Sequence, residues 1–383
     1  MAVGCSRDPD EADAVAEALA QAQSQLDGET PGAAIVFAGA DYEHEVLLSE
    51  VARRFPDVAI VGCVADGQMS SAAGFVVDAV TVTLLASDVV DFRSGLGTDV
   101  SADPAEACRQ AVRAATRDAT QEPALAFAFT DLLQTDLSQV VSSLSAELGS
   151  GVPVVGGASA AEDIRAVPWK SHQFHGTEVL EDSLSVLVLS GPLKYSVAIA
   201  HGWTPTGKAG TVTQAERNKV AAIDDQTVID YYRGYLGDDL EFLWGNPLAV
   251  YEPGREGFIL RAVTASDDET GVSSFMGEVP QGSTVQVSST SVEQILQAAQ
   301  TSVDDARARF PGERGPEAGF IVSCAVRQMM LGSRAPLEFG AVQDALGDGI
   351  PLSGFYAWAE IGPLEGTESR LHNATFVTLL LGT

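Results

Sequence analysis

The sequence has few basic residues for its length, and lysine is especially scarce. Its 383 residues include 53 acidic and 22 basic ones, which gives a formal net charge of −31. A surface this negative repels the phosphates of nucleic acids and the headgroups of anionic lipids, so we expect neither as a partner. The acidic residues are scattered along the chain, and we interpret them as an adaptation to high salt with no direct role in function.

Long apolar runs are also missing. No stretch reaches the 18 or so apolar residues that a membrane-spanning helix needs, and residues 1–9 lack the basic and apolar segments of a secretory signal. We therefore expect a cytoplasmic protein without a membrane partner.

Cysteine is sparse and isolated. Cys5, Cys63, Cys108 and Cys324 form no CxxC pair, so the sequence predicts neither a disulfide framework nor a zinc site. We expect reduced thiols, no bound metal and no cofactor.

What the chain does contain is enough apolar sequence for more than one core. Apolar residues make up 45% of it and charged residues 20%, a balance typical of globular proteins. At roughly 100 to 200 residues per domain, two domains are the simplest expectation. We place the boundary near residue 226, which gives domains of residues 1–226 and 227–383.

One composite pattern recurs three times and predicts the fold class. Each copy has a buried strand, a helix, a second apolar strand that leads into glycine, and a later β-rich strand that begins with Asp or Asn. The predicted segments are 34–38, 42–55, 58–61 and 78–85; then 125–129, 136–148, 152–155 and 182–189; then 319–324, 338–346, 350–353 and 373–380. Apolar strands joined through a helix favour parallel pairing. The sequence therefore predicts an α/β protein in which repeated β-α-β-β units form mixed sheets with packed helices.

The glycines after the second strands are candidate ligand contacts. Gly156 and Gly157 follow one such strand, and Gly354 follows another. Glycine can adopt positive φ and can let a ligand or another backbone approach closely, and open α/β sheets bind ligands beyond the carboxyl ends of their strands. A tight turn without a ligand is the alternative.

Several motifs resemble one known family. They are Val154-Val155-Gly156-Gly157, Cys324-Ala325-Val326-Arg327, Leu352-Ser353-Gly354-Phe355-Tyr356, Glu360-Ile361-Gly362-Pro363 and Leu371-His372-Asn373-Ala374-Thr375. In this order they resemble the FIST proteins, with an N-terminal and a C-terminal FIST domain. Ala359 stands where the family usually has glycine.

The resemblance implies a sensory module that works with signal-transduction and chemotaxis components and binds small ligands, such as amino acids. Because no kinase, receiver or methyl-accepting segment is recognised in the sequence, we expect the signal to pass to a separate protein such as a kinase or chemotaxis component. No enzymatic activity is expected.

The predicted ligand site combines residues from the densest motifs. Arg327 can bind a carboxylate through two parallel hydrogen bonds, while Glu360 or a glycine amide meets an amine or hydroxyl. His372 and Asn373 follow nearby, and the segments Gly156-Gly157 and Gly354-Phe355-Tyr356 complete the predicted pocket. The alternative for the charged pair is an internal salt bridge between Arg327 and Glu360.

Two other functions remain open from the sequence. Cys324 with His372 could serve a cysteine-dependent hydrolase or transferase, since a thiolate needs a neighbouring imidazole or positive charge. A signalling scaffold that binds only other proteins is the second alternative.

Overall fold

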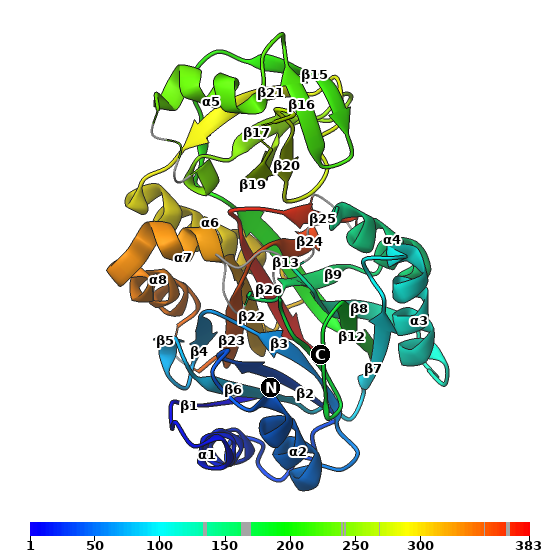
Figure 1. Cartoon of the computed structure of the whole chain (residues 1–383). Coiled ribbons are helices and arrows are strands. Elements are labelled where there is room, and N and C mark those ends of the chain that lie inside the picture. Colours follow the sequence, from blue (N-terminus) through cyan, green and yellow to red (C-terminus); the bar gives the residue numbers. More distant parts are fainter. Residues whose placement is uncertain are drawn as a thin grey trace.

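Three copies of one strand arrangement make up most of the protein, and a smaller β-rich unit is inserted into the third copy (Figure 1). The structure is a computed structural model, and it describes residues 1–132, 136–161, 170–238, 240, 243–267, 269–347, 349–364 and 368–383. Among the helices in these ranges, none combines the length and the apolar character needed to cross a bilayer.

Each copy has the same order of elements. An outer strand and a helix come first, followed by a strand, one or more helices and a second strand, then a β-hairpin and a closing strand. The first copy consists of β1 (Ala2–Ser6), α1 (Glu11–Gln23), β2 (Ala33–Ala38), α2 (His44–Arg54), β3 (Ala59–Val64), β4 (Gln68–Ser70), β5 (Gly74–Val76) and β6 (Val80–Leu85). The second consists of β7 (Asp91–Thr98), α3 (Pro104–Thr116), β8 (Pro123–Thr130), α4 (Ser138–Leu148), β9 (Val154–Ala158), β10 (Gln173–His175), β11 (Glu178–Leu180) and β12 (Ser183–Ser190).

The third copy is interrupted after its outer strand by the inserted unit. Its elements are β13 (Lys194–Ala200), α6 (Val292–Arg309), β22 (Ala318–Cys324), α7 (Ala325–Leu331), the 3-10 helix η2 (Gly332–Arg334), α8 (Pro336–Leu346), β23 (Leu352–Ala357), β24 (Glu360–Pro363), β25 (Ser369–His372) and β26 (Phe376–Gly382). The predicted α/β class, with repeated units in mixed sheets and packed helices, is confirmed.

The three copies are locked together by an exchange of hairpins. Within each copy the two central strands pair in parallel, as β2–β3, β8–β9 and β22–β23. The hairpin that follows them joins the sheet of another copy: β4–β5 pairs with β23, β10–β11 with β3, and β24–β25 with β9. No copy therefore completes its own sheet, and the three form one body.

The inner faces of the three sheets meet in a shared aromatic core. The ring of Phe37 in β2 lies 5.6 Å from Phe129 in β8, 6.1 Å from Phe320 in β22 and 4.6 Å from Phe355 in β23, measured between ring centroids. The outer faces pack on the helices, so these strands are buried on both sides and read as continuous apolar runs. Phe355, predicted to contact a ligand, belongs to this central core.

The repeated glycines lie inside strands and not in tight turns. A Cβ atom on Gly156 would lie 1.9 Å from the carbonyl oxygen of Ala128, and one on Gly354 would lie 2.2 Å from that of Ile321. On Gly157 it would lie 2.5 Å from the carbonyl oxygen of Ala359. The alternative of a tight turn is therefore wrong for these glycines, because each one makes room for another stretch of backbone.

The inserted unit has a sheet and a core of its own (Figure 1). Its elements are β14 (Thr204–Pro205), β15 (Gly210–Glu216), β16 (Lys219–Ile223), α5 (Val228–Leu236), the 3-10 helix η1 (Leu243–Gly245), β17 (Leu248–Tyr251), β18 (Ile259–Arg261), β19 (Val263–Ser266), β20 (Ser273–Phe275) and β21 (Thr284–Ser289). The boundary predicted near residue 226 falls between β16 and α5, so strands on both sides of it pair within this one sheet.

Candidate functional site

Arg327 lies in α7 and is completely buried. Its Nε donates to Oε1 of Glu338 at 2.9 Å, and its Nη2 lies 2.7 Å from the same oxygen. Nη2 also donates to the carbonyl of Ile295 at 2.8 Å, and Nη1 donates to that of His201. All three guanidinium nitrogens thus have protein partners. The sequence-based pairing of Arg327 with Glu360 is wrong, since the partner is Glu338.

Tyr356 belongs to the same buried network. Its hydroxyl donates to Oε2 of Glu338 at 2.7 Å, and the hydroxyl of Ser323 donates to that oxygen at 2.8 Å. Both Glu338 oxygens are therefore occupied by side chains from α7, β22 and β23. The arrangement ties α8 to the third sheet, which is a structural role for Arg327 and Tyr356.

Glu360 and His372 lie together in the second sheet. Strand pairing places Glu360 opposite Gly157 on one side and opposite His372 on the other. The ring of His372 is within hydrogen-bond distance of the Gly362 carbonyl, at 3.1 Å from Nε2, and burial lowers its pKa to about 3. Three of the predicted site residues are thus neighbours, with a neutral histidine among them.

Glu360 occupies a position where the other two copies carry glutamine. Gln68 and Gln173 are also the first residues of their hairpins. Gln68 accepts a hydrogen bond from Thr81 and Gln173 accepts one from Ser183, and both donors lie at the start of the closing strand. Oε2 of Glu360 accepts in the same way from Thr375, from the backbone N at 2.9 Å and from Oγ1 at 2.7 Å. Its Oε1 accepts no hydrogen bond of ordinary geometry from the described part of the chain. Burial raises the pKa of Glu360 to about 7.

This shift makes the stability of the fold depend on pH. Because the pKa of Glu360 rises from 4.5 to about 7 on folding, the folded protein binds the proton more tightly. The free energy of unfolding should fall as the pH rises from 4.5 to about 7 and should stay level above that. Glu360→Gln should remove this dependence and be more stable than the wild type above about pH 7, by on the order of 1 to 3 kcal/mol. Urea denaturation of both proteins across the window measures the effect, and parallel pH profiles would contradict it.

Asn373 and Cys324 lie at the contact with the inserted unit. Oδ1 of Asn373 accepts from the backbone N of Ala262 at 3.0 Å, which fastens the inserted unit to the body. Cys324 is buried, and burial, with a smaller effect from Glu360, raises the pKa of its thiol well above the usual value. A thiol held in its protonated form is a poor nucleophile. Within the described ranges, no group of three or more His, Cys, Asp or Glu side chains is arranged to hold a metal.

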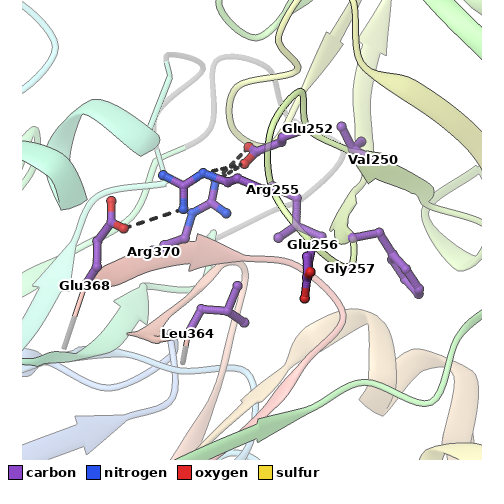
Figure 2. A pocket seen from close by; sticks show the side chains of 10 residues that line it. Val250, Glu252, Arg255, Glu256, Gly257, Leu364, Glu368 and Arg370 are labelled. Atoms are coloured by element: carbon purple, nitrogen blue, oxygen red, sulfur yellow. Dashed lines mark hydrogen bonds and ion pairs between the residues drawn. The ribbon is translucent and has the colours of Figure 1, made fainter. Parts of the chain in front are cut away.

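An open pocket lies elsewhere, between the inserted unit and the β24–β25 hairpin. It has a volume of about 210 Å³ and is lined by the loop between β17 and β18 on one side and by Leu364, Glu368 and Arg370 on the other. Figure 2 shows the guanidinium groups of Arg255 and Arg370 close together, with Glu252 on one side and Glu368 on the other. Each wall of this pocket thus comes from a different unit of the protein.

The ion pairs in this pocket differ in strength. Nη2 of Arg370 lies 2.6 and 2.7 Å from the two oxygens of Glu252, and both side chains are mostly buried. Arg255 lies 3.3 Å from Glu252 and 3.5 Å from Glu368, and about half of its side chain is exposed. The Arg255 contacts are long and solvent-screened, so they are weak and easily exchanged for a ligand.

The pocket continues into a second one of about 510 Å³ along α4. Both are lined by Glu252, Arg255, Glu368 and Arg370, and we call the two together the junction groove. Arg217 and Arg261 also line the second pocket, so the groove collects four of the 22 basic residues of a very acidic chain. This groove could not be predicted from the sequence, because its arginines lie far apart in the chain and share no motif.

Comparison with known proteins places the chain in a family. A family model of the FIST N domain matches residues 32–226, and one of the FIST C domain matches residues 229–363. The "Uncharacterized protein Rv0628c" of Mycobacterium tuberculosis strain H37Rv is 26% identical over 397 residues, covering 98% of this chain and 97% of that protein. The "Uncharacterized protein Mb0898c" of Mycobacterium bovis is 25% identical over 405 residues, with the same shares covered.

A cyanuric acid hydrolase from A. caulinodans is similar over 99% of this chain and 97% of that one. Its TM-score is 0.39 and its sequence identity 10%, which is too low to support any conclusion about fold or activity. The two family models, by contrast, cover most of the sequence. The chain therefore belongs to the FIST family, whose domains generally act as sensory domains in signal transduction.

Proposed function

We propose that the protein is a sensor of a small metabolite, an amino acid or a related compound, which binds in the junction groove, and that it has no enzymatic chemistry of its own. The observation that carries this proposal is the pair of loose contacts that Arg255 makes at 3.3 and 3.5 Å. A ligand carboxylate can replace them at little cost, because they contribute little to the stability of the free protein.

The groove offers both charges that an amino acid needs. Arg255 and Arg370 can bind a carboxylate, and Glu252, Glu256 and Glu368 can accept hydrogen bonds from an ammonium group. A pocket of about 210 Å³ is smaller than the roughly 300 to 1,000 Å³ of sites for drug-sized molecules, which suits a ligand of amino-acid size.

The position of the groove suggests how binding is reported. A ligand that contacts both the β17–β18 loop and the β24–β25 hairpin favours one arrangement of the inserted unit against the body. A separate signalling protein, such as a kinase or chemotaxis component, would recognise that arrangement. Of the alternatives, the cysteine-dependent enzyme has less support, because Cys324 is buried and its thiol pKa is raised.

A thermal-shift screen with the common amino acids and related carboxylates tests the proposal. A ligand at about 100 times its dissociation constant should stabilise the fold by about 2.7 kcal/mol. Arg255→Gln should abolish the shift. Arg53→Gln is the matched control, because Arg53 is an exposed, ion-paired arginine on α2, outside the groove. If no metabolite shifts the wild type, or if Arg255→Gln responds like the control, the proposal fails and a scaffold that binds only proteins becomes the better reading.

A further inference from the structure

Arg261 is a buried arginine without a directly paired carboxylate in the described part of the chain. It is the last residue of β18 and is 2% exposed. Its Nε donates to the carbonyl of Glu278 at 2.9 Å, and its Nη1 donates to those of Leu260 and Leu371 at 3.0 and 3.1 Å. Within the ranges that the structure describes, no carboxylate oxygen lies within ion-pair distance of Arg261, and no group accepts a hydrogen bond from its Nη2.

Two other well-buried arginines each form an ion pair with a glutamate. Arg327 has Glu338 at 2.7 Å, and Arg370 has Glu252 at 2.6 Å. A buried charge without a counter-ion is unfavourable, so proteins normally pair it. Burial lowers the pKa of Arg261 to about 10, so the group still carries its charge at neutral pH. The carboxylates of Glu252, Asp136 and Glu278 act on this charge only at longer range, and none of them pairs with it directly.

The second pocket of the junction groove gives an anion access to this charge. Arg261 lines it together with Arg217, Arg370 and Ser145, whose buried Oγ has no hydrogen-bond partner among the described groups. An oxyanion can accept a hydrogen bond from the Ser145 hydroxyl and can also pair with the Arg261 guanidinium, which has no directly paired carboxylate among the described residues.

The carboxylates that line the same pocket are partly neutralised. Glu252 is bound by Arg370 and Glu368 is contacted by Arg255, while Oδ1 of Asp136 accepts from the backbone N of Ser138. Arg217 and Arg261 line the pocket as well, as do Asp136 and Glu278, so four arginines match four carboxylates in its lining. The pocket thus carries no excess negative charge, although the chain as a whole has a net charge of −31.

We propose that this pocket binds an oxyanion, a carboxylate or a phosphate, with Arg261 as its counter-charge, and that the oxyanion is the second acidic group of the sensed metabolite. This inference rests on the proposed function for the rest of the ligand, which lies against Arg255 and Arg370. The ligand class is an amino acid, or a close relative of one, that carries an additional anionic group on its side chain.

Simple anions test the Arg261 pocket without reference to any amino acid. Inorganic phosphate and sulfate, compared with chloride at matched ionic strength, should raise the melting temperature of the wild type and of the control Arg53→Gln. Arg261→Gln should lose this response, with at least about a tenfold lower affinity for phosphate by calorimetry, as expected for a charge-assisted hydrogen bond. Equal responses of the wild type to phosphate and chloride would overturn the inference.

A second variant covers the case in which Arg261→Gln does not fold. Ser145→Ala removes one unpartnered oxygen from α4 and should fold normally, and it should bind phosphate more weakly than the wild type. If Arg261→Gln unfolds and Ser145→Ala binds phosphate as well as the wild type, the pocket is not the anion site and the inference is wrong.

Matched ligand pairs then connect the anion site to the sensor. L-Glutamate and L-glutamine have the same shape and differ in one charge, as do O-phospho-L-serine and L-serine in their phosphate. The wild type should prefer one acidic member of these pairs by about tenfold or more, and Arg261→Gln should lose the preference while keeping the weaker neutral ligand.

The two proposals can fail separately. If phosphate binds through Arg261 but no amino acid binds, the proposed sensing of amino acids fails and the anion site stands. If amino acids bind without a preference for the acidic member, and phosphate has no specific effect, the anion site fails and the sensor proposal stands. The preference for glutamate or for phosphoserine decides between a carboxylate and a phosphate.

Discussion

Replacing Glu338 by glutamine should lower the free energy of unfolding by about 3 to 5 kcal/mol, which is the usual effect of removing one partner from a buried ion pair. Glu338 is completely buried and receives hydrogen bonds from Arg327, Tyr356 and Ser323. A glutamine amide carries no charge to balance Arg327, and its NH₂ group would face hydroxyls that now donate. The variant leaves a guanidinium in the core without its counter-ion.

Urea denaturation of Glu338→Gln measures the loss. The matched control is Glu50→Gln, because Glu50 also pairs with an arginine, Arg53, but at the exposed surface of α2. Exposed ion pairs contribute little, so this control should unfold almost as the wild type does. A loss in Glu338→Gln no larger than that in Glu50→Gln would show that the network around Arg327 does not hold α8 to the third sheet.

Gly156→Ala should destabilise the protein by about 3 kcal/mol or more, because the new methyl group causes both a steric overlap and backbone strain. Gly156 has a φ of +152°, and a Cβ there would lie 1.9 Å from the carbonyl oxygen of Ala128 in the neighbouring parallel strand. The methyl group cannot be accommodated by a side-chain rotation, because the atom that it meets belongs to the backbone of β8. Gly62 in the first copy has the same geometry against Val36, so Gly62→Ala should behave alike.

Gly340→Ala is the control, with an effect of the opposite sign. Gly340 lies inside α8, and a Cβ there would meet nothing within 4 Å. Alanine is favoured over glycine in a helix interior by about 0.5 to 1 kcal/mol, so this variant should be slightly more stable than the wild type. Thermal and urea unfolding of the three variants give the comparison. Tolerance of alanine at both Gly62 and Gly156 would mean that the parallel strands can separate without cost.

The resemblance to the family and the repeat pattern were both predictable from the sequence. The segments 34–38, 125–129 and 319–324 read as buried strands because each is a short apolar run, and each is a central strand of a sheet. The Cys324 to Arg327 and Glu360 to Pro363 motifs pointed to the FIST family, which the family models show. Apolar runs and short motifs involve only residues that are close in sequence, so they can be recognised without the structure.

The candidate site could not be predicted in the same way. The motif residue Arg327 was expected beside Glu360, whereas the structure pairs it with Glu338, another residue of the third copy. The groove between Arg255 and Arg370 depends on where the inserted unit sits against the β24–β25 hairpin. No sequence spacing predicts that contact, because many other helices and strands separate the β17–β18 loop from the β24–β25 hairpin along the chain.

By itself, then, the sequence determined the family, the class of fold and the three repeated units, since apolar periodicity and short motifs act over a few residues. Only the tertiary structure decided which charges are paired and which are not. The hairpins are exchanged between copies and one unit is inserted between β13 and α6. The partner of each buried charge is therefore set by three-dimensional contacts, and these leave Arg261 without a carboxylate among the described residues while Arg327 and Arg370 each have one.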